Sequence, residues 1–274
     1  MRILSYSFET QLNFSGSVTN HDFILRCAPK STPFQKVLDS QMIMIPGTHL
    51  MEQVDGFGNR LHVGSIPEAH DSFSFTSYGL VMVDQEAECA EAPHPMYLRP
   101  SSFTQPSHEA VVFAGRALQT IPNAHVWKRA VELMHAVYRH FTYDPLATTT
   151  ATTAAQAFSM AAGVCQDYAH SLIMMCRAKG IPARYCAGLM EGEGATHAWV
   201  EVHDGRNWRG LDPTNNRVVD EAYIVFSHGR DFEDCSIERG VFSGAVDQSQ
   251  RVKASVSKDG GATRFAEFAE AAQQ

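Results

Sequence analysis

The hydrophobic pattern of this chain changes its period once, and the change falls at a cluster of prolines. Over about the first 85 residues, apolar residues form short segments separated by turn signals, and Phe73 and Phe75 alternate with serine and threonine. That alternation is typical of half-buried strands. From Val126 to Phe141, apolar residues instead recur on one helical stripe, after Asn123 as the expected helix N-cap. Four of the 12 prolines lie within residues 93–106, where they can neither join a ladder nor continue a helix.

These patterns predict an α+β chain of two domains, which a length of 274 residues allows. We expect a β-sandwich-like N-terminal domain over residues 1–90 and a proline-rich connector over residues 91–106. Residues 107–274 would then form a second domain, in which helices pack on an antiparallel sheet. Within it, the Thr/Ala-rich segment that ends at Gly163 predicts a buried helix. Residues 264–274 predict a short exposed helix.

Charge and hydropathy exclude some classes of partner. The formal net charge of −8 and the pI near 5.9 argue against binding to nucleic acid or to an anionic membrane. No stretch approaches 18 uncharged apolar residues, so no membrane span is expected. The first ten residues lack the apolar segment of a signal peptide, which makes a cytoplasmic location the default expectation.

One of the six cysteines is placed for chemistry. Cys165 follows Gly163 and Val164 and begins a predicted helix over residues 165–179. A helix N-terminus presents unpaired N–H groups and the positive end of the dipole. Both favour a thiolate, which is the nucleophilic form of cysteine. The same N–H groups can stabilise an oxyanion that forms on an attacked carbonyl.

The other five cysteines are expected to be packing residues, because free cysteine is usually a small buried side chain in a reducing compartment. They are Cys27, Cys89, Cys176, Cys186 and Cys235. No Cys-x-x-Cys pair is present, and the spacings match neither a disulfide scaffold nor a compact zinc site. We therefore predict no metal and no cofactor.

A thiol nucleophile needs a base, and the base needs an orienting acceptor. Two predicted strands, His197–Val202 and Trp208–Asp212, are joined through Asp204-Gly205. If those two residues form a two-residue turn, His197 lies directly opposite Asp212 on one face of the sheet. A four-residue loop would make the pair diagonal and still within reach, whereas a three-residue loop would place the two side chains on opposite faces.

Several segments have the form of motifs from a known family. They are Gly163–His170 around the cysteine, Gly180–Tyr185, Thr196–Glu201 around the histidine, Leu211–Asn216 around the aspartate, and His228–Asp231. Together they resemble the motifs of the bacterial transglutaminase-like proteins. In the first domain, Asp55–Asn59 resembles the signature of the β domain that precedes many of these catalytic domains, and Tyr97–Ser101 resembles the junction. The resemblance covers nearly the whole chain.

The resemblance implies a papain-like catalytic domain over residues 107–274, with a Cys–His–Asp triad. Cys165 would be the nucleophile, His197 the base and later the acid, and Asp212 the orienter. The family includes transglutaminases as well as hydrolases and cysteine proteases. The resemblance therefore specifies the thioester chemistry more closely than the acceptor.

The sequence does not identify the second donor to the oxyanion. Gln156 and a nearby indole are the candidates, with the backbone N–H of Cys165 as the first donor. Trp199 lies on the His197 face of its strand by period two and either walls the cleft or packs in the core.

Three classes of function follow. A cysteine hydrolase or peptidase acting on a peptide or amide is favoured, a protein-glutamine transglutaminase is the alternative, and a non-catalytic binding scaffold is the third. The sequence leaves the role of the β domain and the pairing of subunits into a homo-oligomer undecided.

Overall fold

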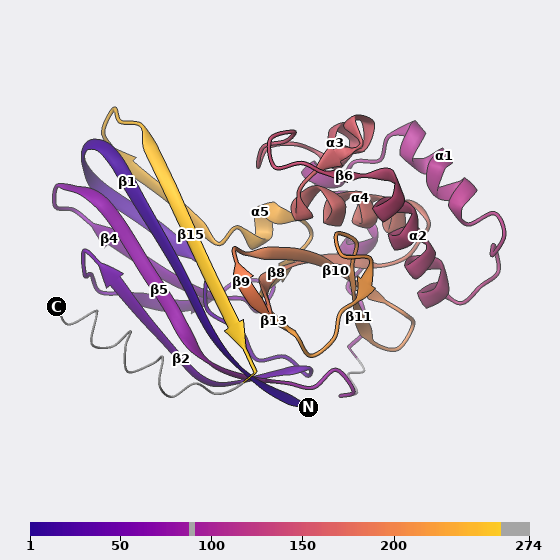
Figure 1. The fold of residues 1–274 in the computed structure, drawn as a ribbon, viewed down its shortest axis with the longest axis horizontal. Helices are drawn as coiled ribbons and strands as arrows, with labels where there is room; N and C mark the ends of the chain where they lie inside the picture. Colours follow the sequence, from indigo (N-terminus) through magenta and orange to yellow (C-terminus); the bar gives the residue numbers. More distant parts are fainter. Residues whose placement is uncertain (88–90, 259–274) are drawn as a thin grey trace.

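The computed structural model describes residues 1–87 and 91–258. Three layers follow one another across the molecule: a large sheet, a second sheet in the middle, and a group of helices on the far side (Figure 1). The predicted α+β class is confirmed, with a β-rich N-terminal part. The helix expected at residues 264–274 and Cys89 lie outside the described residues.

The large sheet is organised around its first strand, β1. The sequence of this strand buries alternate residues such as Leu4, Tyr6 and Phe8, as a period of two requires. The first half of β1 pairs with β5 on one side and β15 on the other, and its second half pairs with β4 and β14. The N-terminal strands are β1 (Arg2–Leu25), β2 (Gln35–Ile45), β3 (Met51–Val54), β4 (Arg60–Ile66) and β5 (His70–Val83).

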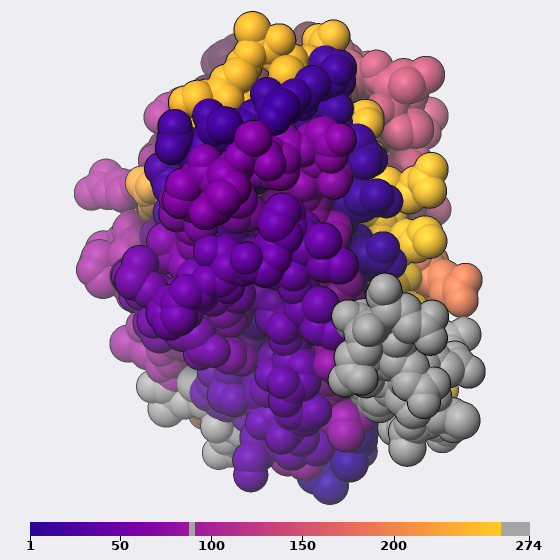
Figure 2. Space-filling view, turned by 90° about the vertical axis from the view of Figure 1, so that its left-hand side faces the viewer, coloured from indigo at the N-terminus to yellow at the C-terminus, as the bar shows by residue number. Residues whose placement is uncertain are grey.

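The end of the described chain returns to this sheet, which the sequence boundaries did not anticipate. We expected residues 107–274 to form one domain, but β14 (Glu238–Ser243) and β15 (Gln248–Ser257) pair with β1. In Figure 1, β15 lies along β1 beside the N-terminal strands. The physical reason is that β1 would otherwise present a long edge of unpaired backbone groups. Figure 2 shows that the outer face is covered mainly by the first strands, with C-terminal residues along its margin.

The two sheets share a hydrophobic core. The β domain core contains Leu189, Ile224 and Phe226 from the middle sheet. The ring of Phe226 lies 5.9 Å from that of Tyr6 and 5.8 Å from that of Phe8, both in edge-to-face arrangements. Burial of large apolar side chains from both sheets in one cluster fixes the domains against each other.

The turn Asp55–Asn59 contributes a polar contact between the domains. The Asp55 carboxylate accepts the backbone N–H groups of Phe57 and Asn59, both at 2.9 Å, which closes the turn. The buried Asn59 amide then donates to the carbonyl of His228 at 2.9 Å and accepts its N–H at 3.0 Å. The buried ammonium of Lys30 donates to the same amide oxygen at 3.1 Å. Two segments singled out in the sequence therefore dock on each other.

The connector is ordered by a buried arginine. It contains two short 3₁₀ helices, η1 (Pro95–Leu98) and η2 (Ser102–Thr104). The guanidinium of Arg177 donates to the carbonyl of Tyr97 at 3.2 Å and to the hydroxyl of Thr104 at 2.8 Å. These bonds hold the connector against the central helix of the second domain.

The second domain has a five-stranded antiparallel sheet in the order β12–β11–β10–β8–β13, with helices on one side. The central helix α4 is buried over almost its whole length. The elements are α1 (His108–Ala117), α2 (Val126–His140), β6 (Thr142–Tyr143), α3 (Ala154–Met160), β7 (Ala162–Gly163), α4 (Cys165–Ala178), β8 (Ala183–Met190), β9 (Gly192–Gly194), β10 (His197–His203), β11 (Trp208–Asp212), β12 (Arg217–Val218), β13 (Tyr223–Gly229) and α5 (Phe232–Cys235).

Two helix predictions need correction. The N-cap of α2 is His125, whose ring accepts the N–H of Trp127, and not Asn123. The Thr/Ala-rich segment forms only the short helix α3, because the threonines before it make turns among themselves. None of the helices within residues 1–87 and 91–258 could span a lipid bilayer.

Candidate active site

Cys165 is the first residue of α4, as the sequence predicted. It follows the short strand β7, and Val164 is the extended N-cap residue. The first N–H groups of a helix have no partner within the helix, so the thiol lies beside free backbone donors. Cys165 is partly buried and lines a cleft. Cys27, Cys176, Cys186 and Cys235 are fully buried, although Cys235 also lies in the wall of that cleft. The prediction that these four are packing residues agrees with their positions.

Asp167 holds the start of this helix in place. Its carboxylate turns back to accept the N–H of Val164 at 2.8 Å and the hydroxyl of Thr148 at 2.7 Å. Burial raises the pKa of this carboxyl, while the two hydrogen bonds act in the opposite direction. Gly163 leaves room for the carboxylate, because a Cβ there would lie 2.4 Å from Oδ2 of Asp167. The glycine and the aspartate are thus parts of one arrangement that positions Cys165.

His197 begins β10 and makes a hydrogen bond with Asp212 at the end of β11. Nε2 of His197 lies 2.8 Å from Oδ2 of Asp212, which leaves Nδ1 for the thiol. The expected two-residue turn is wrong, since residues 204–207 separate the strands and Val200 pairs with Leu211. This register places Asp212 opposite Trp199 and diagonal to His197. The four-residue alternative is therefore correct, and the two side chains still share a face.

Asp212 is fully buried and is surrounded by hydrogen-bond donors. Oδ2 accepts from the hydroxyl of Tyr223 at 2.8 Å and the side-chain amide of Asn215 at 2.7 Å, in addition to His197. Oδ1 accepts the backbone N–H groups of Thr214 at 3.0 Å and Asn215 at 3.1 Å. Burial would raise the pKa of this carboxyl, but hydrogen bonds and the charge of His197 lower it below its usual value. The group is held as a carboxylate.

The charge state of His197 follows from this pair. Burial would lower the pKa of the imidazole, but hydrogen bonds and charge interactions with Asp212 and Cys165 outweigh it and raise the pKa to about 10. An imidazolium at neutral pH is the partner that a thiolate needs. The thiol of Cys165 is one of the groups that raise the pKa of His197, and both side chains line the same cleft.

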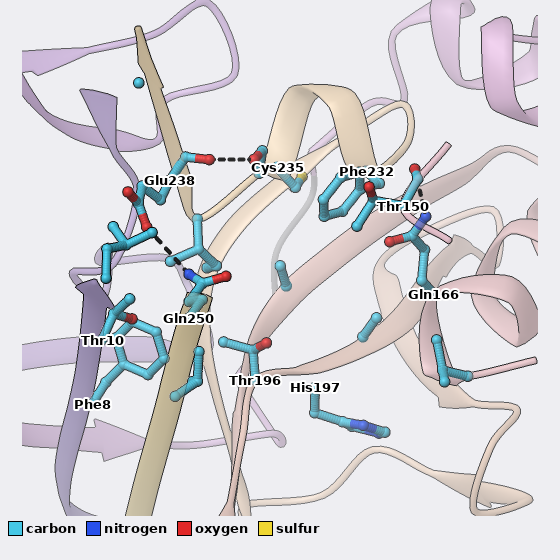
Figure 3. Close-up of a pocket in the computed structure, with 18 of the residues that line it drawn as sticks. Phe8, Thr10, Thr150, Gln166, Thr196, His197, Phe232, Cys235, Glu238 and Gln250 are labelled. Atoms are coloured by element: carbon cyan, nitrogen blue, oxygen red, sulfur yellow. Dashed lines mark hydrogen bonds between the residues drawn. The ribbon is translucent and has the colours of Figure 1, made fainter. Parts of the chain in front are cut away.

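Cys165 and His197 both face a cleft of about 490 Å³ between the two domains. One wall comes from the second domain and includes Gln166, Thr196 and His197, and the opposite wall comes from the β domain. Figure 3 shows His197 and Gln166 on one side of the cleft and Phe8 and Thr10 on the other. A volume of this size accommodates a side chain or a short peptide segment.

Gln156 is not brought to this cleft. Its side-chain oxygen accepts the N–H and the hydroxyl of Thr153, both at 2.9 Å, so it caps α3 at an exposed position. The prediction that Gln156 lies at the site is therefore wrong. Its side-chain amide is used in the capping box of α3 instead. Trp199 is fully buried with Tyr223 and lies beneath His197, with ring centroids 6.3 Å apart. Of the two predicted roles for Trp199, the structure shows packing in the core. Its indole packs against the buried side of the His197 ring.

The sequence reasoning missed several residues that contact the site. Gln166 lines the cleft next to Cys165, and its amide donates to the carbonyl of Thr150 at 3.2 Å. Asn215 stands three residues after Asp212, a spacing that could have predicted a turn that satisfies the carboxylate. Tyr223 left no local signal, because its contact depends on where β13 lies in the sheet.

Comparison with known proteins agrees with this architecture. The model of the transglutaminase-like superfamily matches residues 114–213, and that of the bacterial transglutaminase-like N-terminal region matches residues 4–82. The chain belongs to the transglutaminase-like superfamily, which confirms the resemblance predicted from its motifs.

Three similar proteins illustrate the range of this likeness. An uncharacterized protein of Mycobacterium tuberculosis is 31% identical over 220 residues, which are 68% of this chain and 70% of the relative. A candidate cysteine protease from Cytophaga hutchinsonii has the same fold, with a TM-score of 0.75 at 22% identity over 94% of this chain and 92% of that one. A protein-glutamine gamma-glutamyltransferase of Pseudomonas aeruginosa is 32% identical over 102 residues, 30% of this chain and 15% of its own length.

Proposed function

We propose that this chain is a thiol-dependent acyl-transfer enzyme that hydrolyses a peptide or carboxamide bond, with Cys165, His197 and Asp212 as its triad. The observation that carries the proposal is the common placement of a helix-start thiol and a buried His–Asp pair. Nε2 of His197 lies 2.8 Å from Oδ2 of Asp212, and the thiol of Cys165 and the imidazole of His197 line one cleft. Membership in the transglutaminase-like superfamily supports the same chemistry.

The acylation step uses the thiolate and the imidazolium. The sulfur of Cys165 attacks the carbonyl carbon, and the carbonyl electron pair moves onto oxygen as the C–S bond forms. When the intermediate collapses, the C–N bond breaks and His197 gives its proton to the leaving amine. Asp212 holds the ring with Nε2 toward the carboxylate, so that the opposite nitrogen faces the reacting atoms. The product is a thioester on Cys165.

Deacylation reverses these roles with water. His197 is now neutral and accepts a proton from a water molecule, whose oxygen attacks the thioester. The C–S bond breaks, the acid is released, and the thiolate and imidazolium are restored. Neither half of the cycle needs a redox change or a bound cofactor.

We assign the oxyanion donors to the backbone N–H of Cys165 and the amide of Gln166. The first is one of the free donors at the start of α4. The second lies in the cleft beside the thiol, and only one of its two N–H bonds is used by Thr150 at 3.2 Å. Replacement of Gln166 by alanine is expected to lower kcat by about 10²-fold with little effect on KM.

Amine transfer is the second candidate, since one relative with 32% identity is a protein-glutamine gamma-glutamyltransferase. The acylation step is the same in both reactions, and only the acceptor differs. Ammonia release from a glutaminyl peptide should be measured with and without a primary amine, together with the products. Free acid in both conditions supports hydrolysis, whereas crosslinked product without free acid would establish amine transfer.

The experiment that tests the proposal compares wild type with Cys165→Ala on a library of peptides and amides. We expect the variant to lose turnover of every substrate that the wild type uses, while Cys176→Ala, at a buried packing position, keeps its activity. Iodoacetamide should label Cys165 selectively near neutral pH. A wild-type protein that bound library members without turnover, with an unreactive Cys165, would instead indicate a binding scaffold.

A further inference from the structure

The wall of the cleft opposite the proposed triad belongs to the β domain and carries a polar group of its own. The strands β1, β14 and β15 supply Thr10, Glu238, Gln248 and Gln250 to this wall. Figure 3 shows Thr10, Glu238 and Gln250 together on the side of the cleft away from His197 and Gln166. None of these polar residues takes part in the chemistry described above.

Glu238 is a carboxylate without a compensating cation. Its Oε2 accepts the side-chain amide of Gln250 at 3.3 Å, and no arginine, lysine or histidine forms an ion pair with it in residues 1–87 and 91–258. Burial raises the pKa of this carboxyl to about 7. A partly desolvated carboxylate that faces a cleft favours a ligand that brings a positive charge.

Thr10 provides a second, independent observation. Its side chain is 1% exposed, and its hydroxyl has no hydrogen-bond partner among the described residues. A buried hydroxyl without a partner is costly. Because Thr10 lines the same cleft, a ligand donor that reached this wall would satisfy the hydroxyl as well as the carboxylate.

We infer that this wall is a specificity subsite for a primary ammonium group of the substrate, with Glu238 as its anionic partner and Thr10 and Gln250 as neutral acceptors. The inference rests on the proposed amidohydrolase function, since the reacting amide lies at Cys165 across the cleft. Three oxygen acceptors suit an ammonium, which has three donors and no acceptor. Substrates that carry a carboxylate or phosphate here are disfavoured, because no lysine or arginine is among the described residues that line the cleft.

The ammonium could belong to a lysine side chain or to a free peptide N-terminus, and the experiment separates the two. The probes are heptapeptides centred on glutamine and capped at both ends, with lysine or norleucine at each flanking position in turn. A second set compares free with acetylated N-termini. kcat/KM for each peptide is measured with wild type, Glu238→Gln and Glu193→Gln, the last being the same change at an exposed residue of β9.

Loss of the charge at Glu238 should reduce kcat/KM for the preferred ammonium peptide by about 10- to 100-fold, mainly through KM. The norleucine or acetylated counterpart should change little, and Glu193→Gln should behave like wild type. The set that shows the effect identifies the source of the ammonium. Equal losses for charged and uncharged peptides, or a wild type without any preference for an ammonium, would overturn the inference.

Binding to a Cys165→Ala protein keeps this test independent of turnover. Calorimetry with the same lysine and norleucine peptides should show a higher Kd for the ammonium peptide in the double variant Cys165→Ala/Glu238→Gln than in Cys165→Ala. If wild type hydrolysed no peptide while this selectivity persisted, the catalytic proposal would fail and the subsite would stand. If peptides were hydrolysed but the Kd values did not respond to Glu238→Gln, the subsite alone would fail.

Discussion

Replacement of Asp212 by asparagine tests how the site controls its histidine. Every group that contacts the two carboxylate oxygens donates a hydrogen bond in the structure, including two backbone N–H groups on Oδ1 and the hydroxyl of Tyr223 on Oδ2. An asparagine must therefore turn its NH₂ group toward other donors, whichever way it is oriented. The variant removes the negative charge and also leaves buried donors without an acceptor.

The magnitude follows from the pKa of His197, which stands at about 10 against an ordinary value of 6.5. This difference corresponds to a net stabilisation of the imidazolium of about 5 kcal/mol, at about 1.4 kcal/mol per pKa unit. Burial opposes the charge, so loss of the carboxylate leaves only Cys165 to favour it. We expect the pKa of His197 to fall by about 2 units or more in Asp212→Asn and kcat/KM to fall by about 10²- to 10⁴-fold.

NMR titration of the His197 ring in wild type and Asp212→Asn measures the shift, with His197→Gln to assign the signal. The rate of Cys165 alkylation near neutral pH should fall in parallel, because fewer molecules hold the thiolate–imidazolium pair. Asp247→Asn, the same change at an exposed position, is the control. A His197 pKa that stayed near 10 in Asp212→Asn would refute this account of the site.

Three further predictions concern stability and positioning. Asn59→Ala should lower the free energy of unfolding by roughly 3 to 5 kcal/mol in urea. It removes one acceptor of Lys30, which keeps the carbonyl of Phe57, and it leaves the N–H and carbonyl of His228 without their side-chain partner. A loss close to zero would show that this contact does not hold the domains. Gly163→Ala should reduce turnover, because the new Cβ displaces the Asp167 carboxylate. The double variant Gly163→Ala/Asp167→Ala should lose less turnover than the two single variants predict together. Strictly additive losses would show that Gly163 and Asp167 act independently. The pKa of His197 is raised from 6.5 to about 10, so its contribution to stability is complete below pH 6.5 and is lost as the pH rises toward 10. Relative to His197→Gln, the free energy of unfolding of wild type should fall across this window by up to about 5 kcal/mol, and parallel profiles would argue against the raised pKa.

Local signals were sufficient to predict where the central residues of the candidate site lie. Cys165 begins a helix after a glycine, and His197 and Asp212 lie near the ends of two strands joined by a short loop. Each of these features depends on neighbours in the sequence. The turn was nevertheless misplaced, because Asp204 accepts the N–H groups of Arg206 and Asn207, both at 2.9 Å, which extends the loop to four residues.

Contacts between distant segments could not be predicted in the same way. The alternation of Val252, Ala254 and Val256 is a strand signal, but nothing nearby indicates that β15 pairs with β1. For the same reason the opposite wall of the cleft, with Thr10 and Glu238, was not anticipated. Gln156 caps α3 away from the cleft, whereas Gln166, directly after Cys165, lines it.

The proposed thioester on Cys165 is the central claim, and it can be observed directly. Wild-type protein should be mixed with a glutaminyl peptide that it turns over, quenched in acid during the steady state, digested and examined by mass spectrometry. The proposed mechanism predicts an adduct on Cys165 with the mass of the peptide minus ammonia, which hydroxylamine removes and which Cys165→Ala does not form. Turnover that persisted in Cys165→Ala would contradict it.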